Sequence, residues 1–170
     1  PSTLYDLLSS PDIDAALRAS EQFGAMVSRG GGQVTITGVG GTPLVPKGEI
    51  DVGNAGQVLR FFGALAALTE GEEVHFTGDE SICSRRPIQP LLAALENLGA
   101  RAYSIKGTGY APVAIQGGIA SGQAQMAGHD SQPVSALLMA ASSLEGETTL
   151  DVTNPGEKPW IDVTLDWIHR

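Results

Sequence analysis

The segment GNAGQVLR, residues 53–60, places a glycine-rich turn and one arginine directly before a long apolar run. If a helix begins there, its free backbone N–H groups and its dipole favour an anion, and the glycines let that anion approach closely. Arg60 lies one helical turn further on, where it can support the turn or the anion from below. The segment therefore predicts a phosphate or carboxylate site. The alternative is a core helix capped by Asn54, with Arg60 extending to the surface.

Two other segments carry polar side chains just before a predicted helix. SRRPIQPLL at 84–92 has two arginines before a proline that suits a first helical turn, and guanidinium groups suit phosphate and carboxylate. GHDSQPVS at 128–135 again places polar residues before an apolar helical run. We expect these helix starts to converge with residues 53–60 on one ligand. The alternative for the arginines is a solvated pair on a loop.

The other reactive side chains form no catalytic or metal-binding pattern. Cys83 is the only cysteine, and His75, His129 and His169 have neither the spacing of metal ligands nor an obvious nucleophile partner. Only His129 lies close to a candidate site. We therefore predict no metal and no cofactor, and a structural or incidental role for Cys83.

Composition indicates a folded domain that does not bind nucleic acid or membranes. The 170 residues are 42% hydrophobic and 17% charged, which is typical of a globular protein. The formal charge of −9 argues against a nucleic-acid partner, because phosphate backbones are bound by many Lys and Arg side chains. No apolar run has the length of a membrane span. A lone cysteine fits a reducing compartment, so we expect a cytoplasmic protein.

The chain repeats itself at a spacing of about 75 residues. Residues 16–25 (ALRASEQFGA) align without gaps on residues 91–100 (LLAALENLGA), and the same shift places Gly53 on Gly128 and Gln57 on Gln132. A common shift for separate segments indicates one supersecondary unit that is used more than once.

Hydrophobic periodicity predicts the parts of this unit. Residues 11–24 form an amphipathic helix that ends at Gly24, and four short stretches alternate as strands with one solvated face: 34–38, 74–78, 113–117 and 149–153. The helices at 58–68 and 134–144 are apolar nearly all round, so they belong inside the domain. The prediction is an α/β (α+β) fold with sheets outside and helices within.

Together these segments resemble the enolpyruvyl transferase family, and within it the branch that acts on shikimate 3-phosphate. The matching pieces are GNAG with LRF at 53–61, GD and RPI within 78–88, SQ and SALLMAA within 131–141, and KPWIDVTL at 158–165. The resemblance implies an inside-out α/β barrel domain of repeated β-α-β-α-β-β units around buried parallel helices. It also implies that residues 1–170 are one such domain, without the family's first segment and second domain, so that the fragment alone is inactive.

The implied reaction moves the enolpyruvyl group of phosphoenolpyruvate to the 5-hydroxyl of shikimate 3-phosphate. By resemblance, phosphoenolpyruvate would be held by Asn54, Gly56, Arg86 and Gln132, with Arg60 beneath. Shikimate 3-phosphate would meet Ser131, Gln132 and Trp160, in a region that also holds Asp130 and Glu157. The family's catalytic carboxylates come from its other domain, so no catalytic residue is assigned to this chain.

Some site positions depart from the family pattern. Asp130 and Glu157 stand where serines are usual, and carboxylates beside a phosphate pocket repel the ligand unless a cation intervenes. Either the basic residues are repositioned, or the acceptor is not the standard one. Further departures are Gln57 for Thr, Phe61 for Pro and Trp160 for Tyr.

Two rival functions stay open. A UDP-N-acetylglucosamine enolpyruvyl transferase would share the fold and the donor, but Cys83 is too close to Pro87 for that branch's catalytic cysteine. A non-catalytic domain that binds a phosphorylated ligand or a partner chain would account for the acidic replacements.

Overall fold

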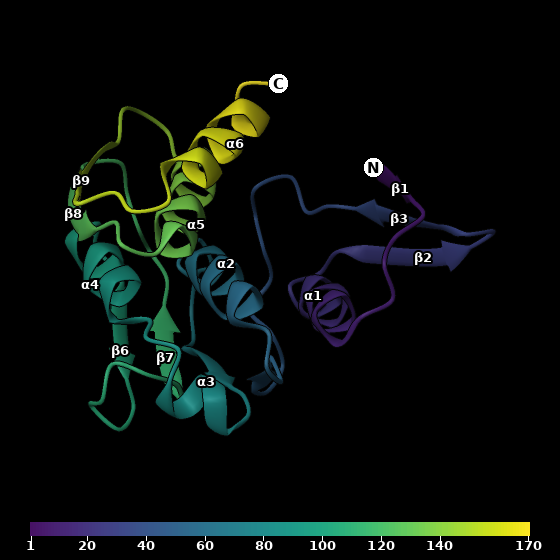
Figure 1. Ribbon diagram of the computed structural model, residues 1–170, viewed down its shortest axis with the longest axis horizontal. Helices are drawn as coiled ribbons and strands as arrows, with labels where there is room; N and C mark the ends of the chain where they lie inside the picture. Colours follow the sequence, from purple (N-terminus) through teal and green to yellow (C-terminus); the bar gives the residue numbers. More distant parts are fainter.

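The computed structural model describes residues 1–170 as three small sheets and six helices (Figure 1). The strands are β1 (Ser2–Tyr5), β2 (Met26–Gly30), β3 (Gln33–Thr37), β4 (Ile50–Asp51), β5 (Val74–Thr77), β6 (Arg101–Ser104), β7 (Val113–Gln116), β8 (Gln123–Ala127) and β9 (Thr149–Thr153). The helices are α1 (Pro11–Gln22), α2 (Gly56–Ala66), α3 (Glu80–Ser84), α4 (Gln89–Asn97), α5 (Ser131–Ala141) and α6 (Lys158–Ile168).

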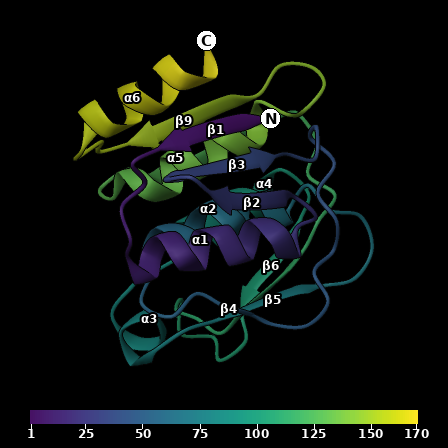
Figure 2. The ribbon, with the colours of Figure 1, turned by 90° about the vertical axis from the view of Figure 1, so that its right-hand side faces the viewer.

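The predicted helix at residues 11–24 is confirmed as α1. The Ser10 side chain caps it by accepting the Ile13 N–H, and Pro11 occupies the first turn, where its missing N–H costs nothing. Gly24 follows the helix at a φ of +98°, a left-handed conformation that ends it without a Cβ penalty. The helix packs on β2 and α2 and runs alongside the three-stranded sheet (Figure 2).

The strands form one antiparallel, one mixed and one parallel sheet. Their orders are β1-β3-β2, β4-β5-β7-β6 and β8-β9, with parallel pairing only between β4 and β5 and between β8 and β9. All four predicted strand segments are strands. The expectation of a solvated face is wrong for β7, in which Val113, Ala114 and Ile115 are all buried. Ala114 pairs with His75 on one side and Tyr103 on the other, and these larger side chains flank the small alanine.

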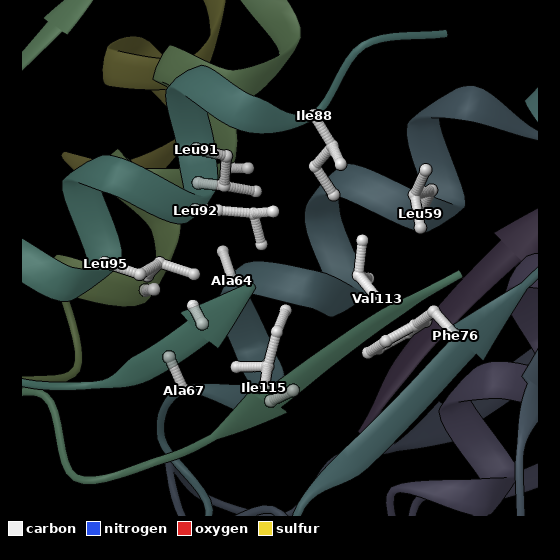
Figure 3. Close-up of a cluster of buried hydrophobic side chains, with 14 of the residues drawn as sticks. Leu59, Ala64, Ala67, Phe76, Ile88, Leu91, Leu92, Leu95, Val113 and Ile115 are labelled. Carbon is white, nitrogen blue, oxygen red and sulfur yellow. The ribbon is translucent and has the colours of Figure 1, made fainter. Parts of the chain in front are cut away.

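The core lies where α2, α4 and α5 meet the mixed sheet. Leu91, Leu92 and Leu95 of α4 point toward Ala64 of α2 and Ile115 of β7 (Figure 3). α2 packs along α5, and α6 packs on α5 at the end of the molecule opposite α3 (Figure 1, Figure 2). This packing anchors the N-terminal ends of α2 and α5, which carry the candidate site.

The two long apolar helices, α2 and α5, were expected to be buried on every side, but one side of the pair is open. Between α2 and α5 an apolar groove of about 170 Å³ stays open, lined by Phe61, Phe62, Leu65, Ala136, Met139 and Ala140. No element of this chain packs over the groove, so Phe61, Phe62 and Leu65 are only partly buried and Met139 is exposed, while the small side chains of Ala136 and Ala140 are buried. None of the six helices is both long and apolar enough to cross a lipid bilayer.

Candidate anion site at the starts of two helices

The turn before α2 is held by its own backbone and by the loop before α3. Gly53 has a φ of +58°, and its N–H donates to Asp51 Oδ1 at 2.8 Å. The Gly53 carbonyl accepts the Asp79 N–H at 2.8 Å, while the Asn54 amide donates to the Asp79 carboxylate. The alternative in which Asn54 caps α2 is therefore wrong, and no side chain caps that helix. The first turn keeps N–H groups that are free of side-chain acceptors.

Asp79 joins this turn to α3. Its Oδ1 accepts the Ile82 N–H at 3.0 Å as the helix cap. The hydrogen bond from the Ile82 backbone, and after it the bond from Asn54, lowers the pKa of the Asp79 carboxyl group. A lowered pKa means that the carboxylate adds stability above its unfolded pKa of about 3.9 and that this stability is lost as the pH falls through the folded value.

Replacing Asp79 with Asn is expected to remove this acid dependence. Asn keeps a capping oxygen but does not titrate. The wild-type free energy of unfolding should therefore fall more steeply than that of the variant when the pH is lowered below about 4. Urea unfolding at several pH values measures this, and parallel slopes for the two proteins would contradict it.

Arg60 is buried beneath the turn. Only 3% of it is exposed, and it connects three segments of the chain. Nη1 donates to the Gly56 carbonyl at 3.1 Å and to Gln132 Oε1 at 3.0 Å, and Nη2 donates to the Pro87 carbonyl at 2.9 Å. Nη2 also lies 3.1 Å from Asp130 Oδ2, and the buried Nε has no partner. The alternative of an arginine that extends to the surface is wrong, because helix packing places the guanidinium under the loop.

Burial lowers the pKa of Arg60, Asp130 opposes this shift, and the positive charge of Arg86 adds to it. The ordinary pKa of arginine is so high that the group stays charged. Arg60 thus supplies a fixed positive charge below the turn while its own bonds position Gly56 and Gln132.

Arg86 is exposed and forms no ion pair or side-chain hydrogen bond in the structure. It lines a pocket of about 200 Å³ together with Asn54, Ala55, Gly56, Gln57, Gln132 and Asp12. The structure therefore brings together four residues that the sequence assigned to one ligand: Asn54, Gly56, Arg86 and Gln132. Arg60 lines neither this pocket nor its neighbour. Sequence reasoning missed Asp12, which enters from α1 and has no local signal that links it to the turn.

A second pocket of about 300 Å³ adjoins the first, because Gln57 and Gln132 line both. Its other lining residues are Phe61, Ser131, Ser135, Glu157, Trp160, Val163 and Thr164. Sequence reasoning missed Ser135 and Thr164, whose hydroxyls are 2.7 Å apart. Each lies four residues after a predicted contact residue, Ser131 or Trp160, so helical spacing was the available signal.

Both of the unusual carboxylates, Asp130 and Glu157, have hydrogen-bond partners within the chain. Asp130 caps α5 by accepting the Gln132 N–H at 3.0 Å through Oδ1, while Oδ2 pairs with Arg60. Glu157 Oε2 accepts the Ser131 hydroxyl at 2.8 Å and the Ser131 N–H at 3.2 Å. These side-chain and backbone bonds lower the pKa of Glu157.

The remaining candidates stay apart from both pockets. Cys83 is half-buried, with its Sγ 3.5 Å from the Gly78 carbonyl, and His75 lies 3.5 Å from Glu73. His129 is not among the residues that line either pocket.

A comparison with protein families matches residues 1–170 to the model described as EPSP synthase (3-phosphoshikimate 1-carboxyvinyltransferase). The chain belongs to the EPSP synthase family. A curated family member from Chlamydia felis, a 3-phosphoshikimate 1-carboxyvinyltransferase, is 43% identical over 170 residues, which are 99% of this chain and 38% of the relative. A protein of the same name from Methanococcoides burtonii is 40% identical over 171 residues, covering 99% and 40% of the two chains.

The fold agrees with this membership. The solved EPSP synthase from Acinetobacter baumannii superposes with a TM-score of 0.79 at 27% identity, over 91% of this chain and 35% of that one. The chain therefore has a mixed α/β fold like that of EPSP synthase domains. It spans about two fifths of the length of the curated relatives it matches.

Proposed function

We propose that this chain is one domain of an enzyme that transfers the enolpyruvyl group of phosphoenolpyruvate to the 5-hydroxyl of shikimate 3-phosphate, with release of phosphate. The observation that carries the proposal is the pair of adjoining pockets that share Gln57 and Gln132. The smaller pocket, with Arg86, is the donor site, and the larger pocket, with Trp160, is the acceptor site. Gln132 would then lie between the two substrates.

The donor site is suited to a leaving phosphate. Arg86 supplies a cation with no partner of its own, the start of α2 supplies N–H groups, and Asn54 is fixed by Asp79. Such preorganised donors stabilise the negative charge that accumulates on phosphate as its bond to the enolpyruvyl carbon breaks. Arg60 acts below them by holding Gly56 and Gln132 in position.

We also propose that the chain repeats one β-α-β-α-β-β unit, with the long helices on the inside. Two observations support a repeat of about 75 residues. α2 and α5 each have 11 residues and begin at Gly56 and Ser131, and β5 and β9 begin at Val74 and Thr149. The glycines Gly24 and Gly99 also share a positive φ, as do Gly71 and Gly146.

The complete protein, on this proposal, has a second domain that closes over these pockets and carries the reacting carboxylates. The 170-residue chain alone should release no phosphate from phosphoenolpyruvate in the presence of shikimate 3-phosphate, because closure is needed to exclude water and assemble the site. Turnover by the chain alone would contradict this. The lone cysteine supports a reducing, cytoplasmic location.

Replacing Arg86 with Gln is expected to weaken phosphoenolpyruvate binding about 10- to 100-fold, because hydrogen bonds to charged groups are each worth about 1.5–3 kcal/mol. Titration of the isotope-labelled chain, followed by amide chemical shifts, measures the dissociation constant and reports whether Gly56 and Gln57 respond.

Arg85→Gln is the matched control, since Arg85 is an exposed neighbour that lines neither pocket. Equal losses in the two variants would mean non-specific charge attraction and would overturn the donor-site assignment. A response of the same pocket to UDP-N-acetylglucosamine, but not to shikimate 3-phosphate, would instead favour the related transferase.

A further inference from the structure

The acceptor pocket contains one charged side chain, and it has the same sign as a phosphate. Glu157 is the only Asp, Glu, Lys or Arg among the nine residues that line the pocket. The neighbouring Lys158 pairs with Asp162 at 2.6 Å. A phosphorylated acceptor would therefore meet a carboxylate in this pocket, with no cation from this chain among the lining residues.

The Glu157 carboxylate accepts hydrogen bonds from the two groups of Ser131 that could bind an anion. This residue opens α5, where the N–H groups and the helix dipole favour negative charge. Its hydroxyl and its N–H both donate to the same oxygen, Glu157 Oε2. A phosphate oxygen that binds at this helix start would need the same two donors.

The backbone fixes the loop that carries Glu157. The Gly156 N–H donates to the Gly128 carbonyl at 2.9 Å, and the Gly128 N–H donates to the Thr153 carbonyl at 2.8 Å. A Cβ on Gly156 would lie 2.8 Å from the His129 carbonyl oxygen, and one on Gly128 would lie 2.4 Å from Val152 Cγ1. The two loops therefore pack at a distance that only glycine allows, which directs Glu157 to the start of α5.

We propose that Glu157 is a specificity-determining residue that occupies the phosphate position of the acceptor pocket and competes with the phosphate group of the acceptor for Ser131. The inference rests on the proposed function, because it takes the larger pocket as the acceptor site. The lowered pKa of Glu157 agrees with a carboxylate that stays ionised at neutral pH. A phosphorylated acceptor binds only after this side chain leaves Ser131, whereas an unphosphorylated, hydroxylated acceptor has no such requirement.

The test compares shikimate 3-phosphate with shikimate as ligands of the wild-type chain, Glu157→Gln and Glu157→Ser. Amide chemical shifts of Ser131 and Gln132 give the dissociation constants, and thermal unfolding checks that each variant is folded. Removal of the charge should tighten shikimate 3-phosphate binding by about tenfold or more, while shikimate binding changes by less than about twofold. Glu147→Gln is the control for net charge, since Glu147 is exposed and lines neither pocket.

Three outcomes overturn the inference: equal gains for both ligands, the same gain in Glu147→Gln, or variants that bind shikimate 3-phosphate no better than the wild type. The Arg86 titration with phosphoenolpyruvate uses a different ligand and pocket, so the absence of specific phosphoenolpyruvate binding counts against the proposed function. If phosphoenolpyruvate binds as expected but the Glu157 variants bind shikimate 3-phosphate no more tightly than the wild type, the result counts against this inference alone.

Discussion

Replacing Arg60 with Met is expected to lower the free energy of unfolding by about 3 kcal/mol, the lower end of the cost of removing one partner from a buried ion pair. Met fills a similar volume but donates no hydrogen bond. The carbonyls of Gly56 and Pro87 and the Gln132 amide oxygen lose the guanidinium as a donor, and Asp130 loses its cation. The lower end applies because the Asp130 side chain is 42% exposed, so water partly solvates it. Urea unfolding followed by circular dichroism measures the change.

Arg29→Met is the matched control for this experiment. Arg29 also pairs with an aspartate, Asp14, but their side chains are 52% and 49% exposed. Exposed pairs contribute about 0.2–1 kcal/mol, so this variant should remain close to the wild type. A loss of less than about 1 kcal/mol in Arg60→Met would mean that the buried network adds little to stability. The Arg60 variant should also bind phosphoenolpyruvate more weakly, because Gly56 and Gln132 lose the group that positions them.

Replacing Gly78 with Ala is expected to lower the free energy of unfolding by about 3 kcal/mol and to distort the turn that carries the proposed donor site. A Cβ at this position would lie 2.6 Å from the Gly53 carbonyl oxygen and 2.8 Å from Ile82 Cγ2. Relief of the contact requires movement of the Gly53 turn, whose carbonyl accepts the Asp79 N–H. The displaced turn would carry Asn54 away from its bond to Asp79. Unfolding experiments and phosphoenolpyruvate titration measure the two effects.

Gly38→Ala separates this contact from the general effect of replacing a glycine. No atom lies within 4 Å of a Cβ built on Gly38, and its φ is not in the left-handed region. This variant should match or slightly exceed the wild type in stability, since alanine restricts the unfolded chain more than glycine. Normal phosphoenolpyruvate binding by a folded Gly78→Ala protein would show that the turn tolerates displacement.

Prediction from the sequence succeeded where the signal was local. The glycine stop of α1, the alternation in β5 and β9 and the presence of two long apolar helices depend on residues within one or two turns of each other. The helix starts were less accurate, since α2 begins at Gly56 and α5 at Ser131 rather than at the predicted 58 and 134. The family membership also follows from residue order alone. The burial of β7 was not predicted, because His75 and Tyr103, which flank Ala114, come from two other strands.

The sequence by itself determined that a glycine turn, paired arginines and a polar loop precede helices whose apolar surfaces must pack. Only the tertiary structure decided which of these groups are free for a ligand. Arg60 and Gln132 are 72 residues apart, Ser131 and Glu157 are 26 apart, and Asn54 and Asp79 are 25 apart. Each contact forms because helix and loop packing brings distant segments together. For that reason Arg60 supports the site from below, Glu157 occupies the start of α5, and Arg86 remains without a partner.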